Sequence, residues 1–119
     1  MKHFAALAMA LTTAGTALAQ DRTPVQRQTL SELAYAMGQS HALRQVCLGA
    51  ADQYWRERMG RLLQTEAADE AFERSLRQAF NTGYAAAQAQ FAACDSLSQA
   101  EAVQVARRGA ALAEAAARP

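Results

Sequence analysis

Apolar residues recur at helical spacing along most of the chain, beginning near residue 30. At about 100° per residue, one face of residues 30–51 collects eight residues, most of them apolar. They are Leu30, Leu33, Met37, His41, Arg44, Cys47, Leu48 and Ala51. The same stripe continues in phase through Trp55, Met59, Leu62 and Glu66. The first helix is expected to start at Thr29, because Thr29-Leu30-Ser31-Glu32 has the spacing of a capping box.

Two layouts fit residues 30–66. One is a single long helix with a soft point at Leu48-Gly49, and the other is a pair of helices that break there. A glycine inside a helix costs only about 1 kcal/mol. The unbroken phase of the stripe favours a continuous or kinked helix, but both layouts stay open.

The second half of the chain predicts two more helices after a turn at Ala67-Ala68-Asp69. The first carries one face made of Phe72, Leu76, Ala79, Phe80, Gly83, Ala87, Phe91 and Cys94. Small residues at 79, 83 and 87 permit close backbone approach, although Gly83 in a left-handed cap would instead break the helix. Ser98-Gln99-Ala100-Glu101 has capping-box spacing and predicts a last helix to about Ala116. Its apolar face is thin, so this helix is expected to dock least stably.

The residue composition supports an all-α fold. Residues 25–118 contain no proline and are dominated by Ala, Arg, Gln, Glu and Leu, which are good helix formers. We expect a disulfide-linked helical hairpin or a small three- to four-helix bundle that forms a single domain over residues 29–117. Residues 20–28 are polar, contain Pro24, and predict a flexible N-terminal arm.

The first nineteen residues have the pattern of a signal peptide. Lys2 provides the positive start, residues 4–14 form an uncharged apolar run, and Ala17-Leu18-Ala19 is a small-x-small cleavage site. The alternative is a buried or membrane-anchoring helix. Cleavage after Ala19 would leave 100 residues with no apolar run long enough to span a bilayer. The sequence therefore predicts a periplasmic protein.

Export changes the interpretation of Cys47 and Cys94, because cysteines in an oxidising compartment most often pair. The two residues are 47 positions apart, and the chain-entropy model gives such a link roughly 4 kcal/mol of stabilisation. A redox-active or nucleophilic cysteine is the alternative. It finds no support in a Cys-x-x-Cys pair or in a histidine next to either sulfur.

Charge and metal-ligand counts exclude several classes of function. After cleavage the chain would hold 11 Arg, 11 Asp plus Glu, no Lys and one His. This balance does not favour nucleic acid as a partner. One His and two Cys cannot build a conventional four-ligand zinc site without carboxylate help, and no Cys-x-x-Cys-His sequence is present for c-type haem. No metal and no cofactor are therefore expected.

Three polar residues, His41, Arg44 and Glu66, interrupt the apolar stripe. A buried polar group is costly unless it is hydrogen-bonded or paired with an opposite charge. One interpretation is structural, with Arg44 paired to Glu66 or another carboxylate. The other is a small polar pocket that faces a ligand such as an anion and includes Trp55 or Tyr84. Catalysis by His41 is a third hypothesis, but no partner group identifies itself, so no catalytic residue is assigned.

Several motifs occur together in an order that we identify with a known family. They are Tyr35-x-x-Gly38-x-x-His41-x-Leu43-Arg44-x-x-Cys47, Trp55-Arg56-x-x-Met59, Leu62-Leu63, Glu66, Phe80-Asn81-x-Gly83-Tyr84 and Cys94. Over residues 30–112 the chain resembles a small family of exported alphaproteobacterial proteins with a domain of unknown function. The resemblance implies a signal sequence and a disulfide, and it implies no activity. Met37 and Val46 stand where the family pattern has leucines, and Glu73-Arg74-Ser75-Leu76-Arg77 matches its Arg-rich segment only in part.

The absence of a catalytic constellation or cofactor motif favours a non-enzymatic role. We expect an envelope interaction or assembly module that binds a protein partner through a helical face, with the oligomeric state left open. The alternative is a small-ligand binder or minor enzyme centred on His41, Arg44 and Glu66. A third hypothesis is a periplasmic chaperone, which would need an exposed apolar surface.

Overall fold

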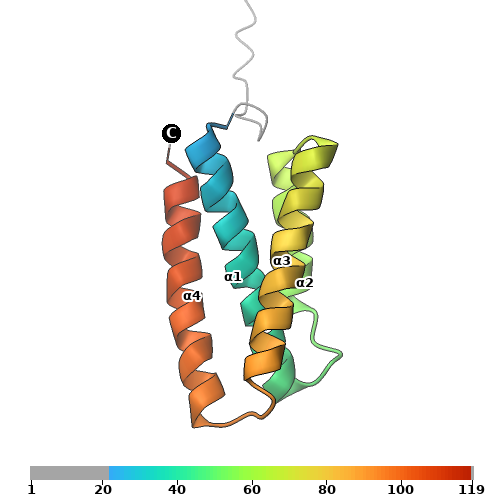
Figure 1. The fold of residues 1–119 in the computed structure, drawn as a ribbon, viewed down its shortest axis with the longest axis vertical. Coiled ribbons are helices and arrows are strands. Elements are labelled where there is room, and N and C mark those ends of the chain that lie inside the picture. Colours follow the sequence, from blue (N-terminus) through green and yellow to red (C-terminus); the bar gives the residue numbers. More distant parts are fainter. Residues whose placement is uncertain (1–21, 119) are drawn as a thin grey trace, which may run out of the picture.

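The computed structural model describes residues 22–118, which form four α-helices and no strand (Figure 1). They are α1 (Pro24–Leu48), α2 (Tyr54–Glu66), α3 (Glu70–Gln90) and α4 (Ser96–Ala116). Successive helices run in opposite directions, so α1 and α3 are parallel. The predicted all-α fold is confirmed in the form of a small four-helix bundle. The predicted signal peptide, residues 1–19, lies outside the described residues.

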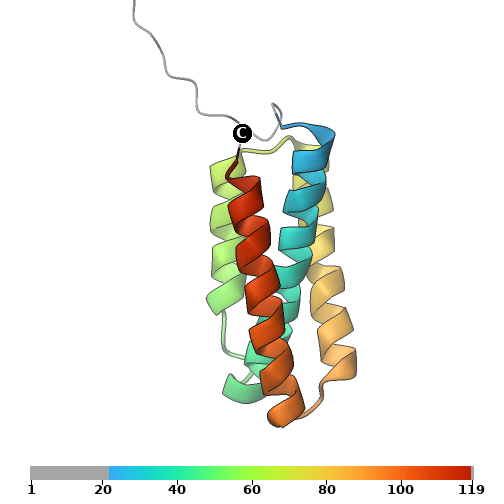
Figure 2. The same ribbon diagram turned by 90° about the vertical axis from the view of Figure 1, so that its left-hand side faces the viewer.

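Helix α1 is the centre of the bundle. It packs against each of the other three helices, and most extensively against α3. Helices α2 and α4 both lie along α1 (Figures 1 and 2). They have almost no contact with one another. The largest fully buried side chains are those of Leu30, Leu76, Val105 and Ser98. No helix of residues 22–118 combines the length and apolar character that a membrane crossing needs.

Two glycines set the close approach of α1 and α3. A Cβ atom added at Gly38 would collide with the carbonyl group of Phe80, and one added at Gly83 would collide with the carbonyl group of Tyr35. The two helices therefore touch backbone to backbone at this crossing. The prediction that small residues around position 83 permit close approach is confirmed, and α3 continues through Gly83 without a break.

The helix starts differ from those expected. Helix α1 begins at Pro24 with Thr23 as its N-cap, and Gln26 completes the capping box. Proline is favoured in the first turn because its missing N–H is not needed there. Thr29 lies inside the helix and donates its hydroxyl to the Val25 carbonyl at 3.1 Å. The expected start at Thr29 is therefore wrong, and residues 24–28 of the expected arm are helical.

The last helix also begins earlier than expected, at Ser96. Asp95 is its N-cap and accepts hydrogen bonds from the backbone N–H groups of Leu97 and Ser98 at 3.0 and 2.9 Å. Ser98 is the third helical residue, and its hydroxyl accepts from the Asp95 N–H at 2.9 Å. Ser98 therefore belongs to a capping box, but as its third helical residue and not as the expected N-cap.

The stripe over residues 30–66 breaks into two helices. Helix α1 ends at Leu48, and Gly49 adopts φ 99°, a conformation that L side chains rarely reach. Residues 49–53 then reverse the chain, and the Gln45 side chain donates to the carbonyl groups of Ala50 and Asp52 at 3.0 and 3.2 Å. The favoured continuous helix is therefore wrong. Both helices nevertheless bury an apolar face in the same core, because α2 folds back along α1.

The predicted disulfide joins Cys47 to Cys94, with their Cα atoms 4.9 Å apart. Cys47 lies in the last turn of α1, and Cys94 lies in the loop between α3 and α4. The parallel direction of α1 and α3 brings these two points to the same end of the bundle. Cys94 was expected on the inward face of a helix, but α3 ends at Gln90 and both cysteines are exposed.

Candidate functional site

The five residues expected to form one polar pocket occupy three separate places. His41 and Tyr84 lie together between α1 and α3. Arg44 lies one turn further along α1, beside the α1–α2 loop. Trp55 lines a hollow that Arg44 also borders, and Glu66 lies at the opposite end of the bundle. The structure therefore divides the expected pocket, and each part has its own partners.

Glu66 holds the start of the described chain. Its two carboxylate oxygens accept hydrogen bonds from Arg22 at 2.7 and 3.1 Å, and Arg22 also donates to the carbonyl of Ala116 at 2.5 Å. Glu66 is buried, with 5% of its surface exposed. This contact ties the N-terminal end of α1 to the last turns of α2 and α4. Sequence reasoning missed Arg22 because it stands in the segment expected to be a flexible arm.

Arg44 is paired locally. Its Nε donates to both carboxylate oxygens of Asp52 at 2.9 Å, and its guanidinium lies 4.5 Å from the centre of the Tyr54 ring. Arg44 was expected to pair with Glu66 or with another carboxylate, and its partner is the other carboxylate, Asp52. Asp52 is only eight residues away along the chain, so the pair fastens the loop that reverses the chain after α1.

His41 is buried between two aromatic rings. The centre of its ring lies 5.6 Å from that of Phe80 and 5.1 Å from that of Tyr84. Its Nδ1 is buried and has no hydrogen-bond partner among the described residues. Burial is the main cause that lowers the pKa of His41 below its usual 6.5, Arg56 lowers the pKa further, and Asp52 opposes the shift. The ring is therefore neutral at neutral pH.

A cavity of about 300 Å³ adjoins this histidine between α1, α2 and α3. We name it the His41 cavity, and its lining consists of His41, Gln45, Arg56, Phe80, Asn81 and Tyr84. The Tyr84 hydroxyl donates to the Gln45 side-chain oxygen at 2.5 Å, which fixes both side chains at one wall. Sequence reasoning placed His41 and Tyr84 in a pocket but did not include Arg56 or Asn81.

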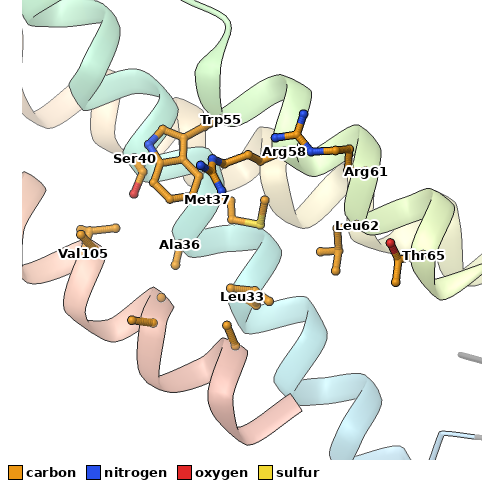
Figure 3. Close-up of a pocket in the computed structure, with 14 residues that line it drawn as sticks. Leu33, Ala36, Met37, Ser40, Trp55, Arg58, Arg61, Leu62, Thr65 and Val105 are labelled. Carbon is orange, nitrogen blue, oxygen red and sulfur yellow. The ribbon is translucent and has the colours of Figure 1, made fainter. Parts of the chain in front are cut away.

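A longer groove runs between α2 and α4, with α1 as its floor. It consists of two hollows of about 400 and 310 Å³ that share Ser40, Trp55 and Ala106. We name it the α2–α4 groove. Its floor includes Leu33, Ala36, Met37, Ser40 and Leu43. Its α2 wall includes Trp55, Arg58, Arg61, Leu62 and Thr65. Its α4 wall includes Gln99, Ala102, Ala106, Gly109, Ala110 and Ala113. Apolar side chains dominate both hollows, and Figure 3 shows the larger one.

The two walls of this groove differ in character. Small residues make up most of the α4 wall, whereas the α2 wall carries an indole ring and two guanidinium groups (Figure 3). Arg58 lies 4.3 Å from the centre of the Tyr54 ring and 5.7 Å from that of Trp55. Within residues 22–118, neither Arg58 nor Arg61 forms an ion pair. The groove is thus apolar along its length and positive at one wall.

No group of three or more His, Cys, Asp or Glu side chains in the described part of the chain is placed to hold a metal ion. Among the hollows of this part of the chain, the His41 cavity and the α2–α4 groove contain residues that the sequence singled out. The first is small and partly polar, and the second is long and mainly apolar.

Comparison with known proteins gives a family match but no activity. Residues 24–118 match the family described as "Protein of unknown function (DUF2385)". The match spans all four helices and both cysteines. No curated protein and no solved structure matches the chain.

Proposed function

The chain belongs to the DUF2385 family, and we propose that it is a non-enzymatic interaction module that binds an acidic amphipathic helix of a protein partner. The observation that carries this proposal is the α2–α4 groove. It is apolar along its floor, and the two arginines on its α2 wall have no carboxylate partner within residues 22–118.

The shape of the groove fits a helix. From Gln99 to Ala113 the α4 wall spans fourteen residue steps, which is about 21 Å or four helical turns. Packed helices lie about 8–10 Å apart, and small side chains permit the closer distances. Ala106, Gly109 and Ala110 supply such side chains on this wall. A docked helix would therefore fill the gap between α2 and α4 as one more member of the bundle.

The chemistry of the groove selects an amphipathic and acidic helix. Apolar residues at helical spacing on the partner would contact Trp55, Met37 and Leu62, as in other helix-in-groove complexes. Arg58 and Arg61 lie three residues apart on the same side of α2, so carboxylates one turn apart on the partner could meet both. Trp and Arg are also the residues that most often dominate binding energy at protein interfaces.

We place this interaction in the periplasm. The proposal rests on the signal-peptide pattern of residues 1–19 and on the exposed disulfide, which is stable in an oxidising compartment and rare in a reducing one. The partner is accordingly a protein of the cell envelope.

A charge-matched pair of variants tests the groove. R58Q/R61Q removes the two groove arginines, whereas R56Q/R107Q removes two arginines that do not line the groove. The full chain is expressed with its N-terminal segment, crosslinked in cells and recovered from envelope extracts. We expect the wild type and R56Q/R107Q to recover the same partner and R58Q/R61Q to lose it. Equal recovery by both variants, or no reproducible partner for the wild type, would refute the proposal.

A further inference from the structure

We propose that the His41 cavity is a second binding site, independent of the groove, for a small organic acid with a short apolar body. The juxtaposition that carries this inference is a buried imidazole with an unpartnered nitrogen, an unpaired arginine and two aromatic walls. The ligand class follows from the charge, polarity and size of the cavity.

The net charge beside the cavity favours an anion. Asp52 is the carboxylate whose field reaches His41, but both of its oxygens already accept from Arg44 at 2.9 Å. Arg56 lines the cavity and forms no ion pair within residues 22–118. One uncompensated guanidinium therefore faces the space, and a carboxylate is the organic anion whose planar geometry matches it.

The remaining polar groups can complete the contact with a carboxylate. His41 lines the cavity with 3% of its surface exposed, and its buried Nδ1 has no hydrogen-bond partner among the described residues, which is an unusual feature of a buried polar atom. Asn81 brings an amide that can donate a further hydrogen bond. The hydroxyl of Tyr84 already donates its proton to Gln45, so it is not counted among the donors to the ligand.

The walls and size of the cavity select an organic acid over an inorganic ion. The rings of Phe80 and Tyr84 flank His41 and present apolar surface to the cavity. A volume of about 300 Å³ lies at the lower end of the range of small-molecule sites. A carboxylate at Arg56 with a chain of a few carbons along the rings fits both limits.

Binding should couple to the protonation of His41. The charged and titratable groups near the imidazole are Asp52 in the loop, which is paired with Arg44, Arg56 on α2 and Tyr84 on α3, while no α4 residue lines the cavity. A bound anion favours the protonated imidazole and so raises the pKa of His41. The complex therefore takes up a proton, and the affinity rises as the pH falls toward the pKa of the ligand-free histidine.

NMR of labelled histidine side chains in the full-length chain tests the site. His3 is the other histidine, and H3Q identifies its signal. The probes are sodium butyrate, sodium acetate and sodium chloride at equal ionic strength. We expect a saturable shift of the His41 signal with butyrate, binding about tenfold weaker for acetate because it lacks two methylene groups, and no saturable shift with chloride. Butyrate should also raise the pKa of His41.

Two substitutions separate this site from the groove. R56Q should weaken butyrate binding by about tenfold or more, whereas R58Q, two residues further along α2, should leave it unchanged. N81A should weaken it as well and provides a second variant if R56Q does not fold. A shift that grows linearly with butyrate, that chloride reproduces, or that R56Q and N81A leave unaltered would overturn the inference. Because R58Q/R61Q tests the groove alone, failure of either proposal can be told from failure of the other.

Discussion

The α1–α3 crossing predicts that a single methyl group at Gly38 destabilises the whole bundle. An added Cβ would collide with the Phe80 carbonyl and approach the backbone nitrogen of Tyr84. Both obstacles are backbone atoms, so no side chain can rotate away, and the helices must separate. Overpacking of this kind costs about 3 kcal/mol at the upper end of its usual range. Alanine regains about 1 kcal/mol of helix propensity. G38A should therefore lower the free energy of unfolding by about 2 kcal/mol.

Gly60 provides the matched control for this prediction. It lies in α2, and an added Cβ would meet no atom within 4 Å. G60A should therefore stabilise the protein by about 1 kcal/mol through helix propensity alone. Urea unfolding followed by circular dichroism, with the disulfide intact, measures both variants. A G38A protein as stable as the wild type would refute the backbone-to-backbone crossing.

A double mutant extends the same test. Gly83 lies at the crossing from the other side, against the Tyr35 carbonyl. Once the helices have separated to admit one Cβ, the second should cost less, so the combined loss in G38A/G83A should be smaller than the sum of the single losses. Additive losses would mean that the two glycines act at independent contacts.

The crossing also places His41, one turn after Gly38, beside Phe80 and Tyr84, so G38A should disturb the His41 cavity.

Three further predictions concern the disulfide, the ion pair and the histidine. C47S/C94S should lower the free energy of unfolding by about 4 kcal/mol, because the 47-residue link no longer restricts the unfolded chain. E66Q should lower it by about 1–3 kcal/mol, because the partly buried Arg22 loses a charged acceptor at the buried Glu66; both are measured by urea unfolding. The pKa of folded His41 lies below 6.5, so its unfolded form binds more protons. Stability should therefore fall as the pH drops below about 6.5, and H41Q should flatten this slope in urea midpoints measured from pH 7.5 to 5.

The ion-pair and histidine predictions each have a control on the same protein. E70Q alters an exposed Glu70–Arg74 pair one turn apart and should change stability by less than about 0.5 kcal/mol. H3Q should keep the slope with pH that H41Q loses. A C47S/C94S protein as stable as the wild type would contradict the predicted effect of the disulfide. An E66Q effect no larger than that of E70Q would contradict the role of the Arg22–Glu66 pair. An H41Q protein with the wild-type pH slope would contradict the role of His41.

Periodicity predicted the helices well because burial of an apolar face is a property of each helix by itself. The stripe through Phe72, Leu76 and Phe80 marks the buried face of α3, and all three side chains are buried in the bundle. The same reasoning failed at the ends. Thr29 and Ser98 have capping-box neighbours, but Thr23 and Asp95 start the helices earlier, and sequence spacing alone did not choose between competing caps.

The candidate pocket was only partly predictable, because polar residues on one stripe need not meet in space. The break at Gly49 turns α2 back along α1, and this reversal carries Glu66 to the other end of the bundle, where Arg22 meets it. Phase continuity across the break could not reveal the reversal. Arg56 and Asn81 face the His41 cavity only because α2 and α3 pack against α1, so their role depends on the tertiary arrangement.

Site-specific crosslinking tests most directly whether the α2–α4 groove binds a partner helix. A photo-crosslinking amino acid is placed at Ala110, which lines the α2–α4 groove, or at Gln104, which is exposed on the same helix outside it. The crosslinked peptide is then sequenced by mass spectrometry after irradiation of intact cells. We predict a crosslink from Ala110, and none from Gln104, to an envelope protein segment with apolar residues at helical spacing and carboxylates one turn apart. Equal crosslinking from both positions, or a crosslink from Ala110 only to residues 1–21 or to a second copy of the chain, would contradict the proposed partner.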